Sequence, residues 1–141
     1  MRTQLFNLLG IDLDVKELIN KKNAVSWFEI PVINLERASK FYSNVFEMKL
    51  EYTKLGNEEM MFFPMNKLGD GASGSLVLVD SNSPSKVGTL IYFYTADLDR
   101  SIKLVLANGG KLLKKQDIGK YGIYAHILDT EGNRIGIHME K

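Results

Sequence analysis

The segment NLERASKFY at residues 34–42 recurs later in the chain as DLDRSIKLV at residues 97–105. The two copies carry Leu, Arg and Lys at matching positions, and each copy follows a short apolar run, at residues 26–32 and 89–95. A repeat at one fixed offset, with a strand and then a helix in each copy, indicates two equivalent units within one domain. We therefore expect any ligand site to lie where the two units face each other.

The first unit reads as a βαβββ module. Alternation in the strand at residues 25–32 places Phe28, Ile30 and Val32 on one face. Asn34 is a helix N-cap, and apolar residues at helical spacing from Leu35 to Phe46 predict a helix that covers this apolar face. Strands are predicted near residues 51–55, 59–64 and 75–80.

The second unit repeats this order. A strand is predicted at residues 89–95, and a helix that Asp97 caps is predicted to run through Ala107. Strands follow near residues 111–116, 122–128 and 134–139, with the last turn at residues 129–133. The fold class is therefore α+β, with module one at residues 25–80, a polar linker at 81–87 and module two at 88–139. Residues 1–24 form an N-terminal extension outside the repeat.

The composition of the chain argues against several classes of function. The 141 residues are 45% hydrophobic and 25% charged, and the formal net charge is +1, so no strong field exists to attract nucleic acid or an anionic membrane. The absence of cysteine excludes disulfides, thiolate nucleophiles and cysteine metal sites. No apolar run approaches the roughly 20 residues that span a bilayer, and the N-terminus makes a poor signal peptide. We expect a cytoplasmic protein.

Two motifs carry a resemblance to a known family. The pattern WFEIPVINLERASKFYSNVF at residues 27–46 resembles the opening of the vicinal oxygen chelate superfamily, which includes glyoxalase I, bleomycin-resistance proteins and extradiol dioxygenases. The run DTEGNRIGIH at residues 129–138 is similar to that superfamily's terminal hairpin. The resemblance implies one domain at residues 25–141, in which two βαβββ modules form a curved mixed sheet shaped as a cup. It also implies a ligand on the concave face, commonly in a homodimer.

The resemblance places metal ligands on the first and last strands of each module, and this chain departs from it there. The corresponding positions hold Trp27, Leu90 and Gly136, whose side chains cannot coordinate a divalent ion. We therefore expect neither a metal nor another cofactor. An alternative is a relocated metal site, in which His126 and His138 face each other across a ladder with Glu29 as third ligand.

By alternation, one set of polar and aromatic side chains shares the presumed concave face, as expected of a small-molecule site. Its members are Trp27, Glu29, Tyr92, Tyr94, Tyr124, His126, Arg134 and His138. Glu29 is the candidate general base, because Trp27 beside it would remove water and raise its pKa. The alternative is that Glu29 forms a salt bridge with Arg134 and only neutralises the cavity.

Three functions remain open at this point. The first is a metal-free protein that binds a small, partly aromatic or amphipathic molecule. The second is a metal-free enzyme that uses Glu29, a tyrosine or a histidine for proton transfer. The third is a metal-dependent lyase or dioxygenase with relocated ligands.

Overall fold

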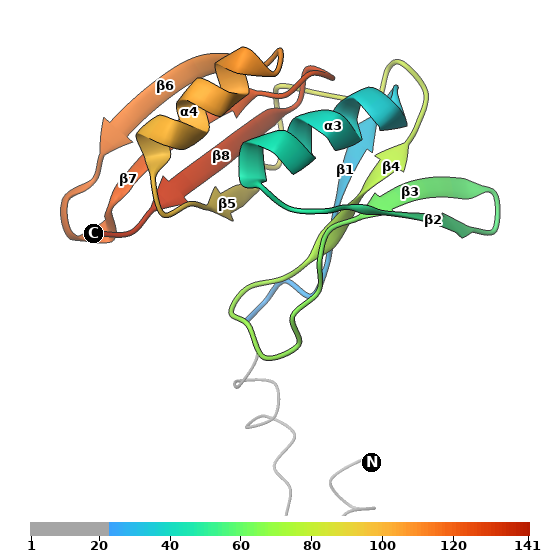
Figure 1. Ribbon diagram of the computed structural model, residues 1–141, viewed down its shortest axis with the longest axis horizontal. Coiled ribbons are helices and arrows are strands. Elements are labelled where there is room, and N and C mark those ends of the chain that lie inside the picture. The colour runs from blue at the N-terminus through green and yellow to red at the C-terminus, as the bar shows by residue number, and fades with distance from the viewer. Residues whose placement is uncertain (1–22) are drawn as a thin grey trace, which may run out of the picture.

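The computed structural model describes residues 23–141, so the extension expected at residues 1–24 lies almost wholly outside the described residues. The chain forms two four-stranded sheets, and one helix covers one face of each sheet (Figure 1). No helix within residues 23–141 is both long enough and apolar enough to cross a membrane.

The first sheet belongs to module one. Its elements are β1 (Phe28–Val32), α3 (Leu35–Phe46), β2 (Glu51–Leu55), β3 (Glu58–Phe62) and β4 (Gly74–Leu78). The strand order is β1-β4-β3-β2, with β1 parallel to β4 and the other pairs antiparallel. The predicted βαβββ order is confirmed, but β1 begins at Phe28 instead of residue 25, so Trp27 precedes the strand.

The second sheet belongs to module two. Its elements are β5 (Tyr92–Tyr94), α4 (Leu98–Ala107), β6 (Lys111–Asp117), the short 3-10 helix η1 (Gly119–Tyr121), β7 (Ile123–Leu128) and β8 (Arg134–Met139). The order β5-β8-β7-β6 repeats that of the first sheet. β5 is shorter than the predicted strand at residues 89–95, because the backbone N–H of Arg134 donates to Ser85 rather than to a residue that would extend β5.

The matched caps of the repeat have the predicted roles. The Asn34 side chain accepts a hydrogen bond from the backbone N–H of Arg37 at 2.9 Å, and the Asp97 side chain accepts one from Arg100 at 3.1 Å. Both cap residues have extended backbones, as helix N-caps usually do. α3 and α4 therefore begin at equivalent points of the two modules and lie next to each other (Figure 1).

The core runs continuously from one module into the other. α3 buries Ala38, Phe41, Tyr42 and Val45, and α4 buries Leu98, Ser101, Ile102 and Val105. Phe28 of β1 and Phe93 of β5 pack edge to face, with ring centroids 5.7 Å apart. Because both helices lie on the core side, the opposite face of each sheet carries no helix.

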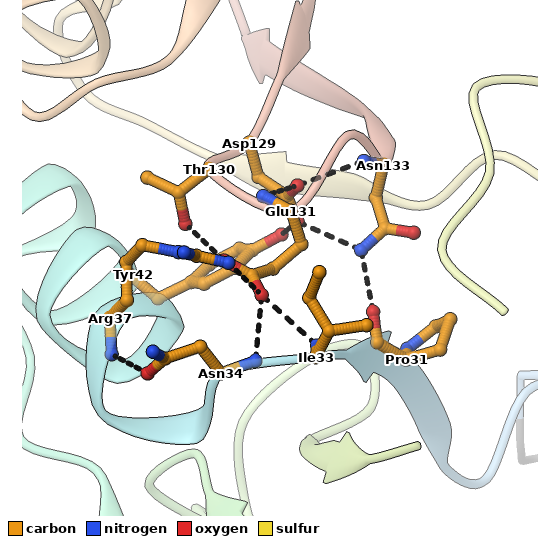
Figure 2. A network of polar contacts seen from close by, with 9 residues as sticks. All are labelled: Pro31, Ile33, Asn34, Arg37, Tyr42, Asp129, Thr130, Glu131 and Asn133. Atoms are coloured by element: carbon orange, nitrogen blue, oxygen red, sulfur yellow. Dashed lines mark hydrogen bonds and ion pairs between the residues drawn. The ribbon is translucent and has the colours of Figure 1, made fainter. Parts of the chain in front are cut away.

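A polar network also joins the modules, and Glu131 is its centre (Figure 2). The Glu131 carboxylate is fully buried and accepts hydrogen bonds from the backbone N–H groups of Ile33 and Asn34, at 3.0 and 2.9 Å. Arg37 donates to it through Nε at 2.8 Å and Nη2 at 2.9 Å, and the Thr130 hydroxyl donates at 2.9 Å. The turn between β7 and β8 thus binds the start of α3.

Asp129 extends this network into the core. The Tyr42 hydroxyl donates to Asp129 Oδ2 at 2.6 Å, and Asn133 Nδ2 donates to the same atom at 3.0 Å and to the Pro31 carbonyl at 2.7 Å (Figure 2). Burial raises the pKa of Asp129, although its hydrogen bonds act in the opposite direction. Burial, with the nearby Asp129 charge, raises the pKa of Tyr42 well above its usual value, so this hydroxyl keeps its proton.

Candidate ligand-binding face

The free face of the second sheet carries most of the predicted site residues. The register of the strands aligns them in two rows across the sheet. The first row is Tyr92, Gly136, His126 and Lys114, and the second row is Tyr94, His138, Tyr124 and Gln116. We call these residues, together with Arg134, the aromatic face.

In the first row, Tyr92 reaches across Gly136 to His126. A Cβ atom at Gly136 would lie 2.3 Å from the Tyr92 ring, so the ring occupies the space above this glycine. The Tyr92 hydroxyl is 2.7 Å from Nε2 of His126. The missing side chain at position 136 is therefore what allows the contact between β5 and β7.

In the second row, the polar ends of the rings are also hydrogen-bonded. The Tyr124 hydroxyl donates to Oε1 of Gln116 at 3.0 Å. His138 Nε2 lies 2.5 Å from the Tyr121 carbonyl, an acceptor, so this nitrogen must carry the proton. The Tyr94 and His138 ring centroids are 6.4 Å apart. These bonds hold the rings of β7 and β8 in place while their faces stay accessible.

The charged side chains of the aromatic face, Lys114 and Arg134, are positive. Burial lowers the pKa of His126 below its usual 6.5, and the charges of Arg134 and Lys114 lower it further. His126 is therefore a neutral imidazole at pH 7. The ammonium group of Lys114 lies 5.5 Å from the centroid of the Tyr124 ring, within the range of a cation–π contact.

Glu29 lies on β1 of the first sheet and Trp27 immediately precedes that strand, so neither belongs to these rows. Trp27 is half-buried and packs edge to face on Phe62, with centroids 5.1 Å apart. Glu29 is exposed, so its carboxylate keeps contact with solvent in the single chain. Glu29 and Arg134 line a cavity of about 200 Å³ where the sheets meet, and the linker residues Ser83 and Ser85 form another wall.

The Arg134 side chain is hydrogen-bonded to the first residue of module two and not to Glu29. Its Nη2 donates to the Gly88 carbonyl at 3.1 Å, and the ion pairs found within residues 23–141 do not include one between Glu29 and Arg134. The Nε atom of Arg134 is buried without a hydrogen-bond partner among the described residues. The structure thus brings Glu29 and Arg134 to one cavity without forming the salt bridge considered above.

Lys114 and Gln116 also lie on the aromatic face, although the sequence reasoning did not include them. Strict alternation would put Leu112, Lys114 and Gln116 on one face of β6, but the register shifts between Leu112 and Lys114. Leu112 pairs with Ile127 on the core side, whereas Lys114 pairs with His126 on the aromatic face. Such an irregularity re-aims side chains, and no pattern within residues 111–117 signals it.

The strand register also contradicts the alternative of a relocated metal site at His126 and His138. His126 pairs with Gly136 and His138 pairs with Tyr124, so the two histidines do not face each other across the ladder. The turn at residues 129–133 sets this register, and a histidine pair would need a different one. Within the part of the chain that the structure describes, no three acidic or imidazole side chains come close enough to hold a metal ion.

The family resemblance implies metal ligands at positions 27, 90 and 136, and the residues found there do not fit a metal either. Trp27 and Leu90 offer no donor atom, and Gly136 has no side chain. The Tyr92 ring also lies over Gly136, in the space that a ligand side chain would need. Chemistry through a metal at these positions would require donor groups that this chain lacks.

Comparison with known proteins agrees with this architecture. A solved antibiotic binding protein from a Streptomyces species is 25% identical and superposes with a TM-score of 0.58, covering 84% of this chain and 97% of that chain. A fosfomycin resistance protein from Listeria monocytogenes superposes with a TM-score of 0.62 at 16% identity, covering 84% of this chain and 94% of that chain. The chain therefore shares its overall fold with both of these proteins.

Sequence comparison extends the likeness to the family level. A glyoxylase-like domain-containing protein from Didymella fabae is 32% identical over 119 residues, which cover 77% of this chain and 88% of that protein. The family model described as Glyoxalase/Bleomycin resistance protein/Dioxygenase superfamily matches residues 24–137. The two βαβββ modules and this match over most of the chain lead to one conclusion: the protein belongs to the glyoxalase/bleomycin resistance protein/dioxygenase superfamily.

Proposed function

We propose that this protein binds a small, partly aromatic molecule on the aromatic face, without a metal ion. The observation that carries the proposal is the pair of aromatic rows, in which side chains are held by hydrogen bonds at their polar ends while Tyr92 and Tyr94 remain 47% and 64% exposed. Exposed rings fixed in this way offer flat apolar contact area and oriented polar groups, the usual composition of a small-molecule site. The Streptomyces relative, described as an antibiotic binding protein, supports a binding role.

Substituting Tyr92 with alanine is expected to weaken binding of aromatic probes by about tenfold or more, because a ring that covers Gly136 and contacts His126 is lost. Titration calorimetry with a panel of small aromatic compounds would measure this, with the recovered compounds analysed by mass spectrometry. Leu106→Ala is the control, because Leu106 is 55% exposed but lies on α4, on the opposite side of the second sheet. Equal losses in both variants would refute the assignment to the aromatic face.

A metal-free enzyme is the second candidate, and the short contact between Tyr92 and His126 favours it. A neutral imidazole 2.7 Å from a phenol hydroxyl is placed to exchange a proton with it. Glu29 remains a further candidate base, since it lines the cavity beside Arg134. The titration above separates the two functions: compounds recovered unchanged support the binding protein, and turnover that Tyr92→Phe or Glu29→Gln abolishes supports the enzyme.

A homodimer in the cytoplasm is part of the proposal. Among the described residues, β2 is an edge strand of the first sheet and pairs only with β3. Its Tyr52 and Leu55 are 57% and 54% exposed, and a symmetric partner would cover such an edge. We expect light scattering to give twice the 15.9 kDa mass of the chain across micromolar concentrations. A mass of one chain throughout this range would contradict the dimer and leave the aromatic face to act within a single domain.

A further inference from the structure

We propose that the molecule bound on the aromatic face is an aromatic anion, such as an aryl carboxylate, whose charged group lies at the Lys114 end of the first row. This inference rests on the proposed function and adds the charge class of its ligand. Four observations carry it: the charges on the four strands, the position of the Lys114 ammonium over the Tyr124 ring, the arrangement of Tyr92 and His126, and the bulge in β6.

The charged side chains of the aromatic face are cationic. β6 contributes Lys114 and β8 contributes Arg134, whereas the β5 and β7 residues of the two rows are tyrosines and the neutral His126. Both charges that act on His126 are positive. Glu29 lies on the other sheet, and Glu140 follows the end of β8, one step beyond the second row.

Lys114 differs from its neighbour in having no acidic partner among the described residues. Lys115 points to the helix side and pairs with Asp99 at 2.7 Å, and at the end of β6 Asp117 pairs with Lys141 at 2.7 Å. The ion pairs among residues 23–141 include none from Lys114, whose ammonium instead lies over the Tyr124 ring. An aryl anion could stack beside Tyr124 and bring its charge to this ammonium.

Tyr92 and His126 complete the anion site with hydrogen bonds. In the tautomer with a proton on Nε2, His126 donates to the Tyr92 oxygen, which leaves the Tyr92 hydroxyl free to donate to a ligand. A bound anion stabilises this arrangement, because each proton in the chain then points toward negative charge. A neutral ligand lacks both this stabilisation and the attraction of Lys114.

The register shift in β6 is what brings the charge into the site. Without the shift between Leu112 and Lys114, the two residues would share a face and Lys114 would lie on the core side with Leu112. The bulge therefore places one lysine on the aromatic face and the next, Lys115, on the opposite face. This gives two adjacent lysines that differ mainly in the face they occupy, which provides a matched control.

The test compares pairs of probes with identical aryl bodies. The probes are the carboxylates of benzene, naphthalene and biphenyl and the corresponding carboxamides. Each probe is titrated calorimetrically, at low ionic strength, into three forms of the full chain: wild type, Lys114→Met and Lys115→Met. We expect each carboxylate to bind about tenfold tighter than its amide in wild type, the difference to fall to about twofold in Lys114→Met, and no change in Lys115→Met. Circular dichroism checks that both variants are folded.

The outcomes separate the proposed function from the charge inference. If no carboxylate or amide binds, the aromatic face is not a site for these molecules, and the proposed function fails together with the inference. If amides bind as tightly as carboxylates in wild type, or if Lys114→Met keeps the full preference, the charge inference alone is overturned. Carboxylate preference that disappears in Lys114→Met and persists in Lys115→Met supports both.

Discussion

Replacing Glu131 with alanine is expected to lower the free energy of unfolding by about 3 kcal/mol, a large part of the roughly 5–15 kcal/mol that stabilises a typical domain. The carboxylate is fully buried, and its removal leaves the backbone N–H groups of Ile33 and Asn34 without their acceptor. Arg37 is 47% exposed and can turn to solvent, so the cost comes mainly from the two backbone donors and the lost link between the modules.

Urea denaturation measures this loss. The control is Asp99→Ala, which breaks the exposed pair with Lys115 and is expected to cost much less, because solvent screens this pair. If Glu131→Ala cost no more than this control, the turn at residues 129–133 would not be a structural link between the modules.

The pH dependence of the same site has a definite sign. Burial alone would raise the pKa of Glu131, but hydrogen bonds from Arg37, Thr130 and the backbone lower it below its usual 4.5. A carboxylate whose pKa is lowered in the folded state stabilises the fold at pH values above its unfolded pKa. This stabilisation is lost as the pH falls through the folded pKa. The stability difference between wild type and Glu131→Gln should therefore be greatest above about pH 5 and shrink in more acidic solution.

The contribution of Asp129 to stability depends on pH in the opposite direction, and comparing wild type with Glu131→Gln removes it. Burial raises its pKa, so its contribution to stability is present below its unfolded pKa and is lost as the pH rises through the folded pKa. Because wild type and Glu131→Gln both contain Asp129, this contribution cancels when the two profiles are subtracted. A difference that grows as the pH falls below about 4 would contradict the assignment to Glu131.

Substituting Gly74 with alanine is expected to cost about 3 kcal/mol of stability. A Cβ atom at this position would lie 2.2 Å from the Phe28 carbonyl oxygen and 2.6 Å from the Phe28 ring. Because Phe28 and Gly74 are register partners in the parallel pair of β1 and β4, the clash is with backbone and cannot be relieved by a side-chain rotation. The two strands would have to separate, which would also displace Glu29 and the start of α3.

Gly56→Ala is the control for this substitution. Gly56 has a φ of +61°, but nothing lies within 4 Å of a Cβ atom there. Alanine at this position meets only the conformational cost of about 1 kcal/mol. Urea denaturation of both variants gives the comparison, and a smaller loss for Gly74→Ala than for Gly56→Ala would show that β1 and β4 are not packed as described.

The sequence alone determined the elements and their order, because the signals for them are local. Asn34 and Asp97 cap helices through bonds to residues three positions later, and alternation placed Ile30 and Val32 in the core. Family motifs then gave the arrangement of the modules. The same alternation assigned Tyr92, Tyr124 and His126 to one face, since regular strands keep a period of two.

Tertiary structure decided the contacts between distant residues. Arg37 and Arg100 occupy equivalent places in the repeat, yet Arg37 binds Glu131 of module two and Arg100 binds Glu47 of module one. A bulge placed Lys114 on the aromatic face, and strand register separated His126 from His138. These outcomes depend on how strands align and modules pack, and a one-residue change in register alters them without any change in local pattern.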